Sequence, residues 1–194
     1  MMRPYYPVLR FTRSRYWAQA GMLRLLGGAV LATLVVLALM ATDLAHAQVG
    51  RAVARFDGGI GVQPALVGGA ANTVNDTQPA GRPWVIADLK ATVLGDGMFD
   101  VRGKGLLLAG GGNVGRNGNA SVRLRLYCGV GATLVSFTSE ESVALEPNGD
   151  FRLSGQLTVT NAPLVCVNAT LLILNAGASA QAPGGWFAAG IPKL

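Results

Sequence analysis

The sequence predicts an all-β protein, an antiparallel β-sandwich of about seven or eight short strands with one disulfide, and a small closed β-barrel is the alternative. Three observations lead to this fold class. Apolar residues recur with a period of two from Trp84 onward. No stretch of ten or more residues after the N-terminal leader combines helical spacing with helix caps. Two cysteines follow the leader, in a chain that we expect to be exported.

The leader is predicted from the order of charge and hydrophobicity in residues 1–47. Five arginines precede an uncharged apolar run from Leu25 to Ala41. The small residues Ala45 and Ala47 then form the pattern that a signal peptidase recognises, so we place the cleavage before Gln48. The alternative is a retained membrane anchor, although the apolar run is shorter than the roughly 20 residues that cross a bilayer comfortably.

Removal of the leader changes what the composition means. The one histidine, His46, leaves with it, and so do five of the 16 basic residues and one of the 10 acidic residues. The formal charge falls from +6 for the whole chain to +2, so the high pI is no argument for binding nucleic acid. We expect an exported protein, periplasmic or extracellular, that touches the membrane only if the leader stays uncleaved.

The remaining chain is expected to have two parts. Residues 48–83 predict an extended segment with a short edge strand at residues 59–63 and a mobile loop around residues 68–82. Residues 84–194 form the predicted core. An oxidising compartment favours a disulfide between Cys128 and Cys166, and two buried free thiols are the alternative.

The core begins with a hairpin whose register can be predicted. A three-residue turn at residues 95–97, with Gly97 left-handed, sets Val93 opposite Phe99 and Asp88 opposite Lys104. A two-residue turn would instead mix the buried and exposed faces. Burial of several apolar side chains, at ~1.5 to 3 kcal/mol each, outweighs any preference between turn types.

Residues 146–150 predict a second turn of the same kind, in a proline, asparagine and glycine context. It would set Leu145 opposite Phe151 and Val143 opposite Leu153. A central strand is expected in residues 164–175, which are apolar on both faces toward their end, and a last strand in residues 185–191.

Between the hairpins, the alternating stretch of residues 121–128 predicts a strand with one core face and one outer face. The core face carries Val122, Leu124, Leu126 and Cys128. Tyr127 lies on the outer face with Arg123 and Arg125, and an aromatic ring beside polar groups is the best candidate for contact with a ligand.

We predict no catalytic residue, no cofactor and no metal site. Serine and cysteine nucleophiles paired with histidine need an imidazole, which the chain lacks after cleavage, and no S-x-x-K motif occurs there. Ligands for zinc or copper are missing or used in the disulfide. The G-x-G-x-x-G match at residues 110–115 precedes a strand rather than a helix, which favours a flexible connection over a dinucleotide site.

Three functional hypotheses follow. The leading one is a non-enzymatic, exported β-sandwich that binds an unidentified protein or glycan partner, or has a structural role, at the cell envelope or outside the cell. The second is a carbohydrate-active protein that uses a pair of carboxylates, since such a pair needs neither histidine nor metal. The third is an envelope domain tethered to the membrane by its uncleaved leader.

At Gly103–Gly112 (GKGLLLAGGG) and Gly184–Lys193 (GGWFAAGIPK), the chain resembles a set of uncharacterised exported bacterial proteins. The resemblance covers roughly the region from Trp84 to the C-terminus, including both cysteines. It implies a shared fold and export, and it brings no activity, ligand or site residue with it.

Overall fold

The computed structural model describes residues 50–67, 70–160 and 163–193. Their main feature is one antiparallel sheet of nine strands. These strands are β1 (Ala52–Gly61), β5 (Asp88–Leu94), β6 (Met98–Lys104), β8 (Ser121–Cys128), β9 (Val135–Thr138), β10 (Val143–Ala144), β11 (Phe151–Gln156), β12 (Thr170–Asn175) and β13 (Trp186–Pro192). The hydrogen-bonded order is β10-β8-β12-β13-β1-β5-β6-β11, and β9 also pairs with β8.

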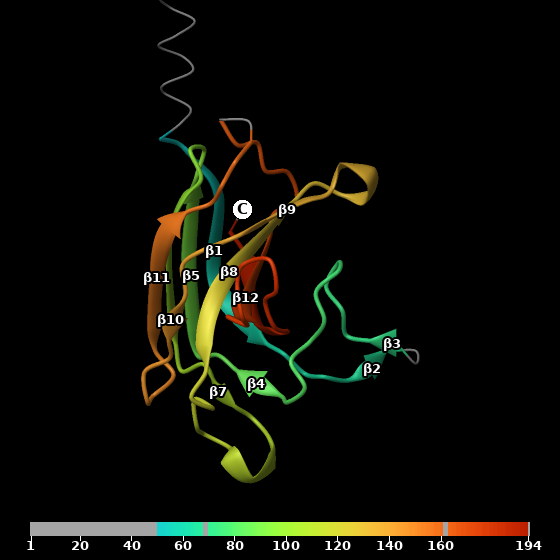
Figure 1. The fold of residues 1–194 in the computed structure, drawn as a ribbon, viewed down its shortest axis with the longest axis vertical. Coiled ribbons are helices and arrows are strands. Elements are labelled where there is room, and N and C mark those ends of the chain that lie inside the picture. The colour runs from blue at the N-terminus through green and yellow to red at the C-terminus, as the bar shows by residue number, and fades with distance from the viewer. Residues whose placement is uncertain (1–49, 68–69, 161–162, 194) are drawn as a thin grey trace, which may run out of the picture. The chain divides into compact units, whose positions relative to one another are not determined.

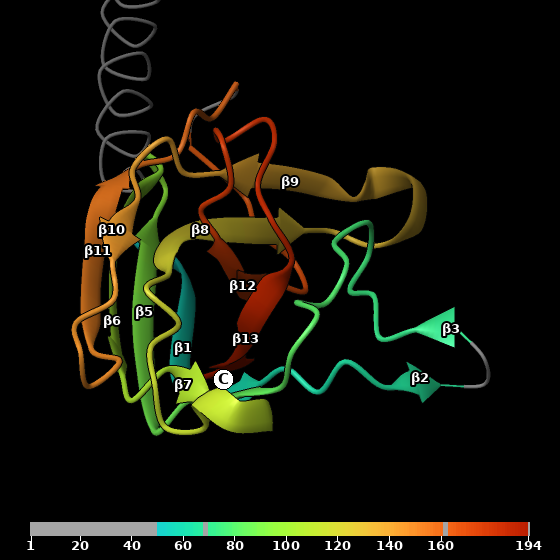
Figure 2. The same cartoon turned by 60° about the horizontal axis from the view of Figure 1, so that its bottom comes forward.

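The sheet curls into a half-barrel, as Figures 1 and 2 show. Its two end strands, β10 and β11, lie beside each other, and the carboxylate of Glu141 packs over Gly155 of β11. The predicted all-β antiparallel fold is therefore confirmed. Because the hydrogen-bonded order is continuous, the architecture lies between the sandwich and the closed barrel that the sequence left open.

Smaller elements decorate the sheet. A short hairpin pairs β2 (Leu66–Val67) with β3 (Ala70–Ala71), and a separate two-stranded sheet pairs β4 (Trp84–Val85) with β7 (Leu107–Leu108), which flank β5 and β6 in the sequence. The described residues also contain two 3₁₀ turns, at Gly111–Asn113 and Gly131–Thr133. The β2–β3 hairpin projects from the body of the molecule in both views (Figures 1 and 2). None of the described helical segments has the length and hydrophobicity to cross a membrane.

The first hairpin has the predicted register. Asp88 pairs with Lys104 and Val93 with Phe99, so the apolar residues of β5 and β6 share the buried face. Gly97 has a φ of 86°, the left-handed conformation that a three-residue turn requires. The Asp96 carboxylate accepts a hydrogen bond from the backbone N–H of Met98, 2.9 Å away, which closes the turn.

The prediction of an edge strand at residues 59–63 is wrong about both the length of the strand and its place in the sheet. β1 covers ten residues, and it lies inside the sheet with β13 on one side and β5 on the other. Its pairing register with β13 shifts between Phe56 and Gly59, and Gly58 has a φ of 95°. This bulge interrupts the period-two pattern, so the sequence shows only the second half of the strand.

The prediction for the second hairpin is correct at the turn and wrong for the strands on either side of it. Gly149 is left-handed, with a φ of 82°, and the N–H of Glu146 donates to the carbonyl of Asp150 at 2.9 Å. The predicted pairs of Leu145 with Phe151 and Val143 with Leu153 do not form. Beyond the turn β10 pairs with β8 and β11 pairs with β6, so the two strands form the opposite ends of the curled sheet and do not pair with each other.

The core lies on the concave face of the sheet. All four predicted core residues of β8 are buried, and residues 171–174 of β12 are fully buried between β8 and β13, as expected of a central strand. The last strand is confirmed as β13. Cys128 and Cys166 form the predicted disulfide, at a sequence separation of 38.

Two parts of the N-terminal predictions fall wholly or partly outside the described residues. The leader and its cleavage site, residues 1–48, are outside, and so are residues 68–69 of the predicted mobile loop. Within the rest of that loop, residues 72–80 are held against the sheet. The backbone N–H of Ala80 donates to the carbonyl of Trp186 at 3.0 Å, and the indole N–H of Trp186 donates to the carbonyl of Asn72 at 3.2 Å.

Candidate binding surfaces

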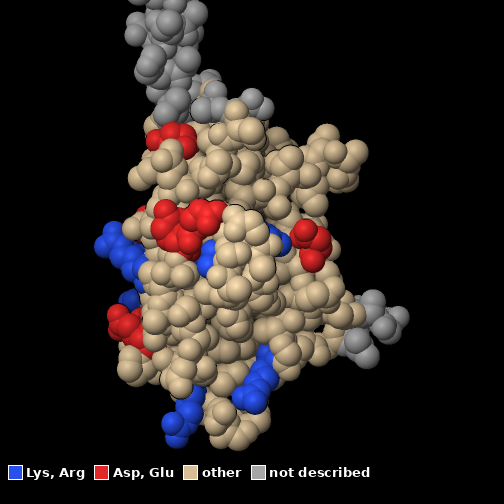
Figure 3. Space-filling view, in the orientation of Figure 1, with Lys and Arg blue, Asp and Glu red and all other residues tan. Residues whose placement is uncertain are grey.

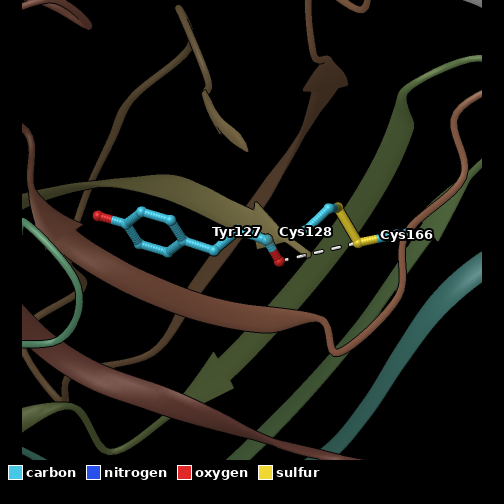
Figure 4. Close-up of a disulfide and its surroundings, with 3 residues drawn as sticks. All are labelled: Tyr127, Cys128 and Cys166. Atoms are coloured by element: carbon cyan, nitrogen blue, oxygen red, sulfur yellow. Dashed lines mark hydrogen bonds between the residues drawn. A yellow bond between two sulfur atoms is a disulfide. The ribbon is translucent and has the colours of Figure 1, made fainter. Parts of the chain in front are cut away.

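The outer face of β8, expected to present an aromatic ring to a ligand, is covered. Tyr127 is 2% exposed and Arg123 is 4% exposed. In Figure 4 the Tyr127 ring points away from the disulfide on the same strand, as alternation along β8 requires. The prediction of an exposed ring at this position is therefore wrong, and the segment of residues 72–80, here named the cover segment, explains the burial.

Polar contacts join the cover segment to β8. The Tyr127 hydroxyl donates to the Asp76 carboxylate and lies 2.5 Å from the hydroxyl oxygen of Thr77. Arg125 donates to the same Thr77 oxygen at 2.9 Å and to Thr138 of β9 at 2.8 Å, and its guanidinium lies 3.6 Å from Asp76. These groups satisfy one another, so the cluster fastens the cover segment to the sheet.

The same contacts shift two pKa values in opposite directions. The hydrogen bond from Tyr127 is the main reason that the pKa of Asp76 is lowered, and the charge of Arg125 acts in the same direction. Burial is the main reason that the pKa of Tyr127 is raised, and the neighbouring Asp76 carboxylate adds to it. At neutral pH the phenol therefore stays protonated and the carboxylate stays charged.

Arg123 is a buried cation held by backbone carbonyls. Its Nε donates to the carbonyl of Ala176 at 2.7 Å, and one terminal nitrogen donates to the carbonyl of Ser139 at 2.9 Å. The side chain thus ties two connections, one after β9 and one after β12, to the middle of β8. None of the three residues expected to contact a ligand points freely into solvent, and their observed role is to hold chain segments together.

A cavity of about 720 Å³ lies beside the pair of strands β4 and β7. Its floor is formed by Trp84 and Phe187, whose ring centroids are 4.1 Å apart. Both rings are almost fully buried, and Gly118 packs against the Trp84 indole. Four glycines contribute to the wall together with the polar residues Asn119, Ser121 and Asn175, and Arg82 is the one charged residue among the described residues that line it. The cavity therefore offers one charge and three uncharged polar side chains to a ligand.

A second surface covers the outer side of β1, β5, β6 and β11, and we name it the charged face. Cross-strand pairing aligns Asp57, Lys90, Arg102 and Arg152 in one row and Arg55, Thr92, Asp100 and Ser154 in the next. Lys193, just after β13, lies beside them. The space-filling view in Figure 3 shows basic and acidic side chains next to each other over the β11 side, at the left.

Ion pairs occupy part of the charged face. The Lys193 amine lies 3.0 Å from the Asp57 carboxylate. The Asp100 carboxylate forms ion pairs with the guanidinium groups of Arg102, at 3.1 Å, and Arg152, at 2.8 Å. The hydrogen bond and charge of Lys193, followed by the charge of Lys90, lower the pKa of Asp57. Burial acts to raise the pKa of Asp100, but the hydrogen bonds and charges of the two arginines outweigh it, so this pKa is also lowered.

Asp57 and Asp100 line the same groove, of about 450 Å³, which makes them the carboxylate pair to compare with a glycosidase site. Glycoside hydrolysis needs one carboxyl group with a raised pKa that donates a proton to the leaving group. Both acids here have lowered pKa values, because cations surround them. The groove therefore lacks the required proton donor, which weakens the carbohydrate-active hypothesis.

Two other sequence features can be placed. The glycine-rich residues 110–115 belong to the connection between β7 and β8 and contain only a three-residue 3₁₀ turn. Within the ranges that the structure describes, no group of three His, Cys, Asp or Glu side chains is arranged to hold a metal ion.

Sequence reasoning missed the charged face. The predicted register of the first hairpin already implied that Lys90 stands opposite Arg102, since it set Asp88 opposite Lys104. Arg152 could not be added, because the sequence suggested a different partner for β11. Asp76 and Thr77 were also missed, and no local pattern links them to Tyr127, about 50 residues away.

Comparison of the chain with protein-family models, with curated proteins and with solved structures found no match. The resemblance of residues 103–112 and 184–193 to exported bacterial proteins therefore stays a prediction.

Proposed function

We propose that the protein is exported, loses its leader and acts as a non-enzymatic β domain that binds a partner at the cell envelope or outside the cell. The single observation that carries the export is the disulfide between Cys128 and Cys166. Disulfides persist in oxidising compartments and are rare where glutathione and thioredoxin keep thiols reduced. The basic and apolar leader supplies a route to such a compartment.

The position of the disulfide supports a structural role in the domain. It joins the end of β8 to the segment that leads into β12, and β8 and β12 are neighbours in the sheet. Cys128 is almost fully buried and Cys166 is partly buried, which limits the access of external thiols to the bond. Both cysteines of the chain are used in it. The pairing thus has the properties of a stable bond rather than of a redox switch.

The charged face supports a binding role. It is the part of the described surface where charged side chains of several strands converge on one groove, while the cluster at Tyr127 is occupied by its own contacts. Binding through exposed charges needs no proton donor, which matches the lowered pKa values of Asp57 and Asp100.

Export is tested with the full chain, carrying a C-terminal tag and expressed in a bacterial host. The expected result is a product in the periplasm or the medium that begins at Gln48 and resists thiol labelling until it is reduced. Substitution Ala47→Phe removes the small residue before the cleavage site, so this variant should keep its leader. A control substitution must lie before Ala52, because β1 begins there. Val49→Phe, just after the predicted site, is the matched control and should be processed normally.

Two outcomes would count against the proposal. An exported product that still begins at Met1 would instead support the membrane-tethered hypothesis. A cytoplasmic product with two free thiols would remove the argument for export altogether.

A further inference from the structure

We propose that the charged face binds an acidic polysaccharide, a glycan chain whose repeating carboxylates contact the cations of β1, β5, β6 and β11. The inference rests on the binding role proposed above and names the chemical class of the partner. The residues that carry it are Arg55, Lys90, Arg102, Arg152 and Lys193, with Asp57 and Asp100 as the acids among them.

The arrangement of cations is unfavourable for the isolated domain. Lys90 is directly opposite Arg102, and Arg102 is directly opposite Arg152, so three positive charges stand abreast on adjacent strands. Neighbouring strands lie about 4.8 Å apart, and like charges directly opposite each other destabilise a sheet. A chain of anions laid across the strands would relieve this repulsion.

The acids of the charged face compensate only part of its positive charge. It holds six basic and three acidic side chains when the cross-strand pair of Asp88 and Lys104 is included, a net of +3. The described residues as a whole carry 11 basic and 9 acidic side chains, a net of +2. The rest of the described domain is thus slightly negative, and the attraction for an anion is concentrated on this one surface.

Two of the cations are free to take a ligand. Among the described residues, neither Lys90 nor Arg55 has a side-chain carboxylate within ion-pair distance, whereas Lys193, Arg102 and Arg152 each have one. Lys90 and Arg55 are exposed, both line the 450 Å³ groove, and they are diagonal neighbours on β5 and β1. Diagonal side chains on adjacent strands are about 7–8 Å apart, so one carboxylate can contact both.

The side chains between the cations favour a glycan over a lipid surface or a single-stranded nucleic acid. Thr92 and Ser154 flank Asp100 on the neighbouring strands and offer hydroxyls to sugar hydroxyls. The aromatic rings of these strands, Phe56, Phe99 and Phe151, are buried on the opposite face. They are not available to stack on bases or to insert into a bilayer.

The inference is tested with the protein expressed from the full chain and purified in the form that the cells produce. The probe is polygalacturonate, measured by biolayer interferometry at low ionic strength, with neutral dextran as the comparison. Binding is expected to polygalacturonate alone and to weaken as salt is added, because the contacts are exposed charges.

The double variant Arg55→Gln/Lys90→Gln should weaken binding about tenfold, since two exposed charge contacts that each contribute about threefold combine. Its matched control is Arg82→Gln/Arg116→Gln, which removes the same charge from exposed loops outside the charged face. The control should change binding by less than about twofold. The double variant should unfold at a nearly unchanged temperature, because the lost repulsion between Lys90 and Arg102 and the lost attraction between Lys90 and Asp57 oppose each other.

A gain of binding provides the second arm. Asp100→Asn releases Arg102 and Arg152 from their shared carboxylate, so affinity for polygalacturonate should rise. Equal loss in the two double variants, no loss in Arg55→Gln/Lys90→Gln, or tighter binding to anionic lipid vesicles or single-stranded DNA than to polygalacturonate would overturn the inference. Because this assay uses purified protein, its failure leaves the export test unaffected, and failure of the export test leaves this result standing.

Discussion

Removal of the disulfide between Cys128 and Cys166 is the perturbation whose effect can be worked out most directly from the structure. The bond closes a loop over a sequence separation of 38 residues. In the chain-entropy model, a loop of this size restricts the unfolded chain by an amount that corresponds to about 4 kcal/mol. A typical domain has a free energy of unfolding of about 5 to 15 kcal/mol, so the loss would be a large fraction of the total.

The native state itself should change little when the bond is removed. The N–H of Gly129 donates to the carbonyl of Val167 at 2.6 Å, and β8 remains paired with β12 from Thr170 onward. These contacts hold the two cysteine positions together without the sulfur bond. The predicted destabilisation therefore comes from the unfolded chain, which gains freedom.

The assay is urea-induced unfolding followed by tryptophan fluorescence, because Trp84 and Trp186 are both buried and will report the loss of the core. The double variant Cys128→Ala/Cys166→Ala is compared with the oxidised protein. For an m value of about 2 kcal/mol/M, a loss of about 4 kcal/mol lowers the midpoint by about 2 M urea. The reduced protein, which keeps both sulfurs, is the control that separates the cross-link from the packing of the Cys128 side chain.

A refuting result is a loss below about 1 kcal/mol in both the double variant and the reduced protein. The disulfide would then contribute little beyond the contacts around it, and the entropic reasoning would be wrong for this domain. A loss in the double variant alone would assign the effect to packing of the buried sulfur rather than to loop closure.

Three further predictions concern single positions. Tyr127 is the one tyrosine after residue 47, so ultraviolet titration of the processed protein reports its ionisation alone. Its pKa should lie above the ordinary value of about 10, and Asp76→Asn should bring the pKa closer to that value. Because the pKa of Tyr127 is raised in the folded protein, the stability contributed by the protonated phenol is present below about pH 10 and is lost as the pH rises through the folded pKa. A pKa of about 10 in the folded protein would contradict the buried contact with Asp76. Gly103→Ala should lower the free energy of unfolding by about 1 to 3 kcal/mol, because a Cβ there overlaps the Phe151 ring, whereas Gly112→Ala, with open space around it, is the neutral control. Arg123→Met should cost about 1 to 3 kcal/mol by leaving the carbonyls of Ala176 and Ser139 without their donor, and a loss no larger than that of the exposed control Arg116→Met would show that these bonds contribute nothing. Urea unfolding measures both pairs.

Much of the local structure follows from the sequence. Alternation identifies the buried face of β5, β6, β8 and β11, and a left-handed glycine identifies each turn. The register of the first hairpin was predictable because one short turn links its two strands, and only one register buries all their apolar side chains. The cysteine pairing was predictable because the chain has only two cysteines.

The charged face and the covered β8 surface depend on contacts between segments far apart in the chain. The alternating pattern of β11 says which side chains are buried, but Arg152 joins the row of cations only because β11 pairs with β6 instead of β10. The alternating pattern places Tyr127 on the outer face of β8. It is buried because the cover segment, which contains Asp76 and Thr77, packs over it.

The sequence by itself determined the all-β class, the faces of most strands and the first hairpin, since each depends on the alternation of neighbouring residues. It also determined the disulfide, because two cysteines can pair in only one way. The tertiary structure alone decided that β1 is central, that the second hairpin opens and that the cations stand in one row. The physical reason is that a strand's residues specify which side faces the core, whereas its neighbours are selected by the packing of the whole curled sheet.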